Sequence, residues 1–249
     1  MPFTLSHPAL VLPLGRRPLA VLGTLALPAL VAGSMSPDVP YYTPLPQTMR
    51  PWTHSWVGAF TVDVLLAVVL LAFGVFVAAP VAALLAPRAG EIVGGWTASA
   101  WPAARSARAV GVWYAALALG GLSHVLWDAF THGEGQVVQV VPSLRDVVAG
   151  QPLYEWLQLL SSVVGGAVVL VVLVRACRAE PDDGTGVPDP RRLSLVAGVV
   201  VTATVVGGLM RPALSQWSWF TVLTGAGAGL VVAVLAYASW ARWSERVRA

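Results

Sequence analysis

The sequence contains no lysine, a single cysteine and little charge for its length. Of its 249 residues only 11% are charged and 57% are hydrophobic, and the mean hydropathy is +0.72. A soluble domain usually carries about 25% charged residues. With Cys177 as the only cysteine, an intrachain disulfide is excluded. The scarcity of charge and the long apolar runs predict a membrane protein rather than a soluble domain.

The 15 basic residues are all arginines, and they lie at the ends of the apolar runs instead of in one patch. Nucleic-acid binding requires basic side chains gathered on one face, so we expect no nucleic-acid partner. The sequence also lacks a phosphate-binding glycine loop and a serine nucleophile motif, which sets aside those enzyme classes.

Five segments are apolar and close to the length of about 20 residues that a helix needs to cross a bilayer. They are residues 56–79, 109–130, 155–176, 193–210 and 219–240. We therefore expect an all-α fold, a polytopic bundle of about five spanning helices in a single membrane domain over residues 1–249. Within it we distinguish a motif-bearing part (1–165), a cytoplasmic linker (178–192) and two C-terminal spans (193–249).

Two shorter apolar segments, residues 5–15 and 18–33, precede the first span. The pair Arg16-Arg17 separates them in a turn flanked by glycine and proline, which predicts a short helical hairpin with the arginines at its tip. Such a hairpin returns His7 to the level of Asp38. The alternative is a signal peptide, since the arginines precede an apolar core and small residues, and its cleavage would remove His7. The apolar stretch before the arginines favours the hairpin.

The arginines also predict an orientation. When the loops are assigned to alternating sides, 12 of the 15 arginines fall on one side, and only Arg50, Arg145 and Arg211 fall on the other. The positive-inside rule places the 12 in the cytoplasm, in a bacterial inner membrane, and the tryptophans form a belt at each boundary.

Six ionisable residues are predicted on the side with few arginines: His7, Asp38, His54, His124, Asp128 and His132. His124 and Asp128 are four residues apart, so they share one face of a helix and can hold a metal ion between them. The alternative for this pair is a hydrogen bond at a helix end. His132 lies one further turn along and can serve a neighbouring ion.

The other members of this set have ordinary structural interpretations when each is taken alone. His54 is then an interfacial polar anchor, Asp38 a turn residue beside prolines, and His7 a residue of a short helix capped by Ser6 or Thr4. The prediction of a metal site rests on the convergence of all six.

Four more polar residues are expected near this end of the helices. Asp63 lies inside the first predicted span, where a carboxylate in lipid is costly; it either supports a ligand histidine or makes an internal hydrogen bond that fixes helix packing. Glu155, Gln158 and Ser162 open the third span and either complete the pocket or pack helices together.

These motifs resemble those of an uncharacterised bacterial membrane family known as a domain of unknown function. It is similar to predicted inner-membrane metal-dependent hydrolases and, more remotely, to the zinc-dependent phospholipase C and single-strand nuclease superfamily. The resemblance covers residues 1 to about 165. It rests on the segments Met1-Pro2-Phe3-Thr4-Leu5-Ser6-His7-Pro8, Gly33-Ser34-Met35-Ser36-Pro37-Asp38, Thr53-His54-Ser55, Ser123-His124-Val125-Leu126-Trp127-Asp128 and Thr131-His132-Gly133.

The resemblance implies one zinc ion surrounded by four ligands, His54, His124, Asp128 and Asp38. Asp128 would bridge to a second ion held with His7. In the soluble superfamily a further ion uses the histidine that matches His132, together with a later histidine and glutamate. No histidine follows His132 in this sequence, and Gln158 and Ser162 stand at that spacing. We therefore expect one or two zinc ions and not three.

The resemblance and the position of the site at the outer interface imply a membrane-bound hydrolase. Its substrate would be a phosphoester in a membrane lipid or a lipid-linked molecule, attacked by a metal-activated water that Asp38 orients. Arg50 and Arg145 lie on the same side, and each is either a phosphate-binding residue or a solvated loop residue. The alternatives are a non-catalytic protein with a structural metal site and a transporter, for which Asp63 is the one acid well inside a span.

Overall fold

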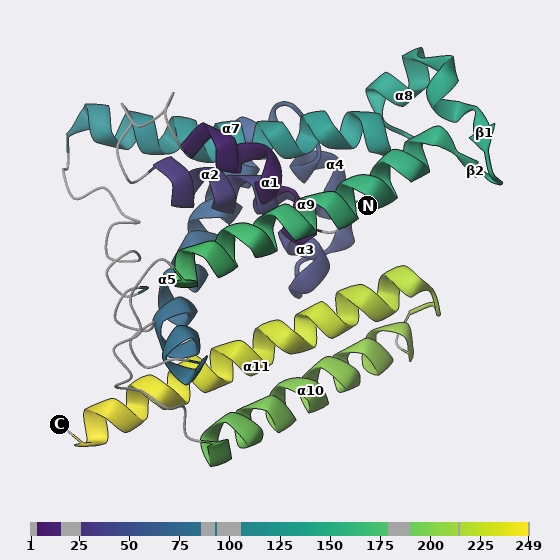
Figure 1. Cartoon of the computed structure of the whole chain (residues 1–249). Helices are drawn as coiled ribbons and strands as arrows, with labels where there is room; N and C mark the ends of the chain where they lie inside the picture. The colour runs from purple at the N-terminus through teal and green to yellow at the C-terminus, as the bar shows by residue number, and fades with distance from the viewer. Residues whose placement is uncertain are drawn as a thin grey trace. The chain divides into compact units, whose positions relative to one another are not determined.

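The computed structural model describes residues 4–15, 26–85, 93, 106–178, 190–213 and 215–248. Five helices in these ranges are long and apolar enough to cross a membrane, which confirms the expected all-α membrane fold (Figure 1). They are α5 (Val62–Leu85), α7 (Ala107–Thr131), α9 (Leu153–Arg178), α10 (Pro190–Ala213) and α11 (Trp219–Arg248). Strands in the described ranges are limited to the antiparallel pair β1 (Val147–Val148) and β2 (Gln151–Pro152).

The first spanning helix begins at Val62 and not at residue 56, as the sequence suggested. The short helix α4 (Arg50–Thr53) ends at His54, whose backbone (φ −107°, ψ 36°) is not helical. A 3₁₀ turn, η6 (Gly58–Phe60), follows, and Thr61 (φ −128°, ψ −92°) closes it before α5 starts. His54 is therefore held in a tight connection beside the span rather than in its first turn.

The described residues group into two compact units. Unit 1 draws on residues 1–39, 48–71 and 100–181, and unit 2 on residues 40–47, 72–99 and 182–249. All six predicted metal-site residues belong to unit 1.

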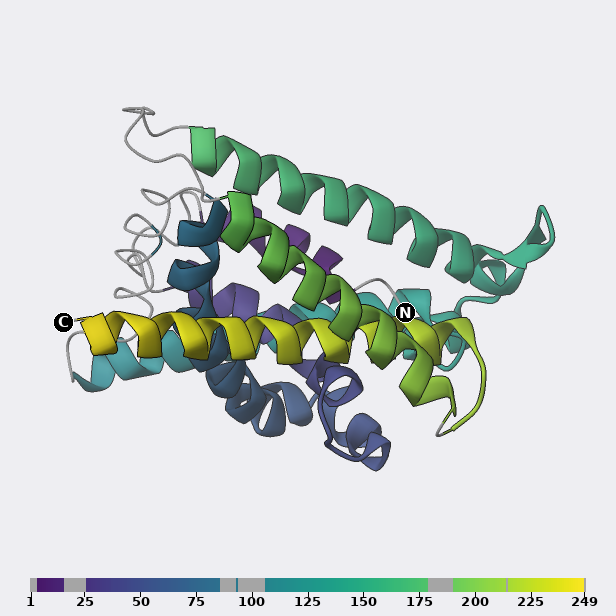
Figure 2. The ribbon, with the colours of Figure 1, turned by 90° about the horizontal axis from the view of Figure 1, so that it is seen from below.

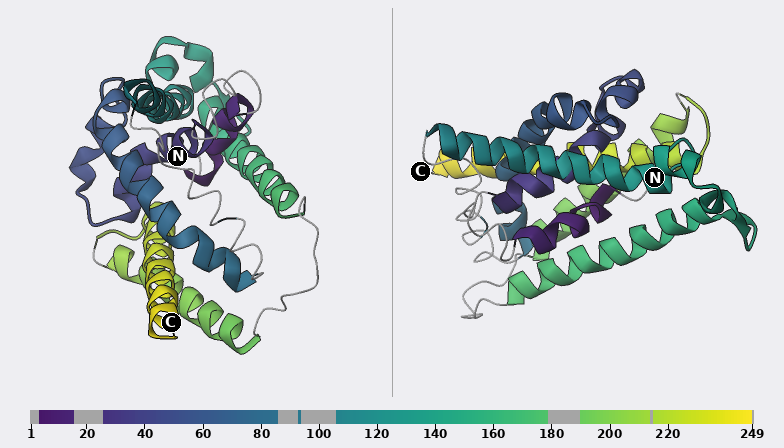
Figure 3. Two further views of the ribbon diagram at one scale, coloured as in Figure 1. Left: turned by 90° about the vertical axis from the view of Figure 1, so that its left-hand side faces the viewer. Right: turned by 90° about the horizontal axis from the view of Figure 1, so that it is seen from above.

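In unit 1 the N-terminal segment packs among the long helices. It comprises η1 (Thr4–Ser6), α1 (Pro8–Val11) and η2 (Leu12–Gly15). α1 contacts both α2 (Ala26–Met35) and α9, and α2 lies along α7, as the right-hand view of Figure 3 shows. The two described arms thus adjoin each other, as expected for a hairpin. Its predicted tip, with Arg16 and Arg17, lies outside the described residues.

The backbones of α2 and α7 approach closely where Gly33 faces Gly120. A Cβ atom added to Gly120 would lie 2.3 Å from the carbonyl oxygen of Leu30 and 2.8 Å from the Cα of Gly33. Only glycine permits this distance, in the same way that small residues mediate close helix contacts in membranes. The approach matters for the site, because it brings the backbone of Ser34 next to His124.

In unit 2, α10 and α11 pack against each other: they run side by side in Figure 1 and cross at an acute angle in the view of Figure 2. Gly207 and Gly225 face each other at this contact, and a Cβ on either would lie 2.2 Å from the other's carbonyl oxygen. The guanidinium groups of two arginines attach further segments to the pair: Arg211 donates to the carbonyl oxygen of Tyr41, and Arg242 donates to that of Phe76. Unit 2 therefore has a glycine-mediated helix pair as its framework.

Candidate metal centre

The structure brings the six predicted residues together at one end of unit 1, where α7 ends and α5 and α9 begin. His124 and Asp128 lie in the last turns of α7, and His132 directly follows that helix. The others come from three separate segments: His7 lies between η1 and α1, Asp38 ends η4 (Ser36–Asp38), and His54 follows α4.

Four side-chain atoms form a compact set of possible ligands. The Nε2 atom of His54 lies 3.4 Å from Oδ1 of Asp38 and 3.6 Å from Oδ2 of Asp128. The Nε2 atom of His124 lies 3.6 Å and 3.3 Å from the same two oxygens. Ligand atoms at about 2.0–2.1 Å from a tetrahedral zinc ion are separated by about 3.3–3.4 Å. The four measured separations are close to that spacing, so neighbouring atoms of the set can share an ion. Two groups of three residues have ligand atoms that all lie within 4.8 Å of one another: His54, His124 and Asp128, and His7, Asp38 and His124.

The second oxygen of Asp128 faces a different pair of imidazoles. Its Oδ1 atom lies 3.8 Å from Nε2 of His7 and 3.5 Å from Nδ1 of His132. The same Nδ1 atom lies 3.2 Å from the backbone carbonyl oxygen of Asp128, which can only accept, so this nitrogen of His132 carries a proton. Asp128 therefore presents one oxygen to His54 and His124 and the other to His7 and His132. A carboxylate in this position is suited to bridge two ions.

The buried polar atoms of this cluster have few other partners. Apart from contacts within the cluster, no hydrogen bond from the described residues reaches Nε2 of His124, Oδ1 of Asp38 or either carboxylate oxygen of Asp128. The same holds for both ring nitrogens of His7. Buried polar atoms without hydrogen bonds are destabilising, and a bound cation would satisfy several of them at once.

The ligand atoms are oriented by hydrogen bonds on their far sides. The Thr4 hydroxyl donates to Oδ2 of Asp38 at 2.5 Å. The Nδ1 atom of His124 lies 2.8 Å from the carbonyl oxygen of Ser34, which can only accept, so this nitrogen carries the proton and Nε2 is left as the acceptor. The Nδ1 atom of His54 lies 3.0 Å from the hydroxyl of Thr53. Such outer contacts fix the tautomer and direction of metal ligands.

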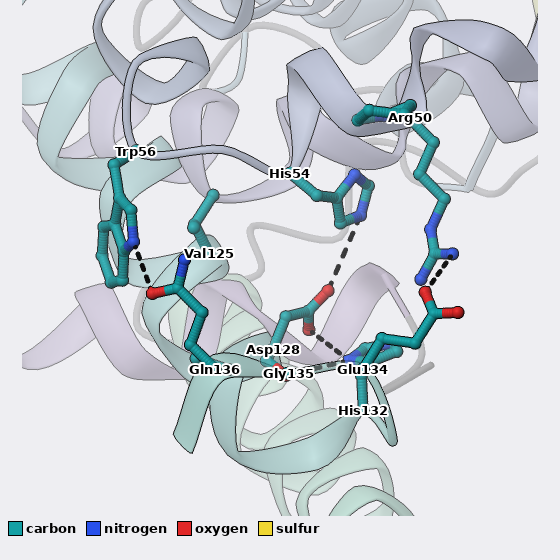
Figure 4. Close-up of a pocket in the computed structure, with 11 residues that line it drawn as sticks. Arg50, His54, Trp56, Val125, Asp128, His132, Glu134, Gly135 and Gln136 are labelled. Atoms are coloured by element: carbon teal, nitrogen blue, oxygen red, sulfur yellow. Dashed lines mark hydrogen bonds and ion pairs between the residues drawn. The ribbon is translucent and has the colours of Figure 1, made fainter. Parts of the chain in front are cut away.

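The cluster has a closed side and an open side. His7, Asp38 and His124 are at most 2% exposed. His54, Asp128 and His132 line a cavity of about 290 Å³, and Figure 4 shows His54 facing Asp128 across it. An ion in this cluster would thus be shielded on one side and accessible from the cavity on the other.

The charge states of the two N-terminal members suit metal binding. Burial, reinforced by the neighbouring His124, lowers the pKa of His7 to about 3, which keeps its imidazole neutral at physiological pH. Burial alone would raise the pKa of Asp38, but the imidazoles of His124, His54 and His7 outweigh it and hold that pKa below its usual value. A neutral imidazole and a charged carboxylate are the forms that bind metals.

Asp63, expected either to support a ligand histidine or to make an internal hydrogen bond, lies buried beside the cluster. Its side chain is buried, and neither carboxylate oxygen has a hydrogen-bond partner among the described residues. Because the first span begins at Val62, Asp63 lies in its first turn instead of two turns inside it, and its Cβ packs against Gly121. Asp63 is therefore a buried neighbour of the cluster, without a hydrogen bond to a ligand histidine among the described residues.

The polar patch at the start of α9 is also separate from the cavity. Glu155, Gln158 and Ser162 are not among the residues that line it. The Ser162 hydroxyl donates to the carbonyl oxygen of Gln158 in its own helix, and the Glu155 carboxylate accepts from Tyr154. Further along α9, a Cβ on Gly165 would lie 2.8 Å from Ser6, so this helix serves to pack the segment that carries His7.

Sequence reasoning missed the residues that orient the ligands and form the mouth of the cavity. Thr4 was considered only as a helix cap, and no sequence pattern points to the carbonyl group of Ser34. At the mouth, the indole of Trp56 donates to the side chain of Gln136 at 2.9 Å, and Arg50 faces Glu134. A side chain 80 residues away in sequence can be paired in this way only after the fold is known.

The comparisons with known proteins give one match. Residues 1–239 match the family described as a domain of unknown function, DUF4184. No curated protein and no solved structure matches the chain. Since the match covers nearly the whole sequence, the chain belongs to the DUF4184 family.

Proposed function

We propose that the protein is a membrane-bound, metal-dependent hydrolase of phosphoesters in lipids or lipid-linked molecules. The observation that carries the proposal is the spacing of four ligand atoms, from His54, His124 and the two aspartates, beside a cavity open to substrate. The inner-membrane location and an extracytoplasmic site remain part of the proposal, and the arginine distribution along the sequence supports them.

The ligand chemistry favours zinc. Imidazole and carboxylate ligand atoms at these separations match the preferences of Zn²⁺. His7, Asp38 and His124 form a second group whose ligand atoms lie within 4.8 Å of one another, so the proposal allows one or two ions. When bound, zinc lowers the pKa of a coordinated water towards about 7 and polarises a phosphoryl oxygen.

The side chains of the protein would hold the ion and leave it accessible to the substrate. Asp38 lies on the closed side with one oxygen held by Thr4 and the other directed at the imidazoles, which favours a ligand role over the water-orienting role expected from the sequence. His54 and Asp128 would hold the ion at the cavity wall, where a phosphoryl group can reach it. The apolar helices would present the cavity to substrates that already lie in the bilayer.

A structural metal site is the second candidate. Four protein ligands can complete a tetrahedral zinc ion and leave no position for substrate, as in structural zinc sites. Accessibility from the cavity favours the hydrolase, and only an activity measurement separates the two.

The test uses purified, zinc-loaded protein in detergent, incubated with a panel of phospholipids and lipid pyrophosphates. We expect release of a phosphorylated headgroup or of phosphate, and loss of both activity and zinc in His124→Ala and Asp128→Ala. Glu155→Gln, which changes an acid at the same end of unit 1 but outside the cavity, should keep both. Zinc binding without hydrolysis of any substrate would favour the structural site, and absence of zinc from the wild-type protein would refute both.

A further inference from the structure

The cavity beside the metal cluster is also lined by a basic residue, Arg50. Arg50 begins α4, and its carbonyl oxygen accepts the backbone N–H of His54 at 2.9 Å. One helical turn therefore separates the two side chains, and both line the same cavity (Figure 4). A group bound near the cluster would thus have the Arg50 guanidinium within the same enclosure.

The guanidinium of Arg50 is only weakly engaged by the protein. Its Nη1 atom lies 3.9 Å from Oε2 of Glu134, whose side chain is 91% exposed. Its Nε atom is buried and has no hydrogen-bond partner within the described part of the chain. An ion pair this long between exposed side chains contributes little, so an anion that accepts two hydrogen bonds can replace Glu134.

The structure separates the two arginines that the sequence left as equal candidates. Arg50 lines the cavity, whereas Arg145 lies in η7 (Pro142–Arg145), is exposed and does not line it. Arg145 is therefore a matched control for Arg50.

We propose that Arg50 binds the phosphate group of the substrate and that Glu134 is a counter-ion displaced when that phosphate enters. This inference rests on the proposed function, and it names the residue that recognises the phosphate group of the substrate. Arginine recognises phosphate through parallel N–H···O bonds. The cavity of about 290 Å³ is at the small end of ligand pockets, which favours a small headgroup.

The experiment measures binding of two probes, inorganic phosphate and a short-chain phosphatidic acid, to zinc-loaded protein in detergent. Isothermal titration would compare the wild type with Arg50→Gln, Arg50→Lys, Glu134→Gln and Arg145→Gln. Zinc content and thermal unfolding are recorded for each variant, to show that each one is folded and loaded.

We expect Arg50→Gln to weaken binding of the phosphate group by about tenfold or more. Arg50→Lys should lie between that variant and the wild type, because lysine keeps the charge but loses the paired geometry. Glu134→Gln should tighten binding, since the competing carboxylate is gone, and Arg145→Gln should match the wild type. With this pattern, tighter binding of the lipid than of inorganic phosphate assigns the site to a lipid headgroup, and equal binding assigns it to a free phosphate.

Two different failures can be distinguished. If Arg50→Gln is folded and zinc-loaded and still binds both probes like the wild type, the role of Arg50 is refuted while the metal site stands. If the wild-type protein holds no zinc, the proposed function fails, and this inference fails with it.

Discussion

The close approach of α2 and α7 predicts that one added methyl group on α7 damages the metal site from a distance. In Gly120→Ala the new Cβ would lie 2.3 Å from the carbonyl oxygen of Leu30, whereas ordinary contact begins at 3.4 Å. The helices must therefore move apart by about 1 Å, and overpacking of this kind costs about 1–3 kcal/mol. The hydrogen bond from His124 to Ser34, now 2.8 Å, would lengthen beyond the usual limit of about 3.2 Å.

The zinc affinity should fall with the loss of this hydrogen bond. Removing such an outer contact typically weakens metal binding by about 10- to 100-fold, or about 1.4–2.7 kcal/mol. The assay is chelator competition on purified protein, combined with thermal unfolding. The same helix offers two controls: a Cβ on Gly111 meets no atom within 4 Å, and a Cβ on Gly121 meets its nearest atom at 3.5 Å. If Gly120→Ala matches Gly111→Ala in both zinc affinity and unfolding temperature, the helix contact does not position His124.

Three further predictions concern the surroundings of the cluster. Thr4→Val removes the hydrogen bond to Asp38 but keeps the shape of the side chain, and it should weaken zinc binding about tenfold in the same competition assay. An unchanged zinc affinity would show that this contact is dispensable. Asp63→Asn should change the zinc affinity by less than about threefold, because Asp63 makes no hydrogen bond to a ligand residue in the described structure. Loss of a hydrogen bond to a metal ligand typically weakens metal binding by more than that. A larger loss of affinity would show that Asp63 supports a ligand. Removal of zinc by a chelator should lower the unfolding temperature, since free zinc at a thousand times its Kd stabilises the folded state by about 4 kcal/mol. An identical melting curve with and without the chelator would contradict a zinc site inside the folded unit.

The fold and the composition of the cluster were largely predictable from local patterns. The spacing of His124 and Asp128 needs only helical periodicity. The return of His7 to the level of Asp38 follows from the hairpin expected of residues 5–15 and 18–33, whose tip lies outside the described residues.

Three features required the structure because they depend on contacts between distant segments. The first span starts six residues later than expected: Val57-Gly58-Ala59-Phe60 is apolar enough to continue a helix, yet it folds into a 3₁₀ turn that closes on Ser55. The carbonyl group of Ser34 becomes a partner of His124 only through the facing glycines. Asp63 follows the shifted start of the helix and lies in its first turn.

The central claim is that imidazole and carboxylate ligands from these segments surround one or two zinc ions. Zinc K-edge X-ray absorption of the purified, zinc-loaded protein tests it most directly. We expect a first shell of nitrogen and oxygen at about 2.0–2.1 Å with the outer-shell scattering of at least two imidazoles, and loss of this shell in Asp128→Asn. A shell containing sulfur, or one of about six oxygens without imidazole scattering, would contradict it.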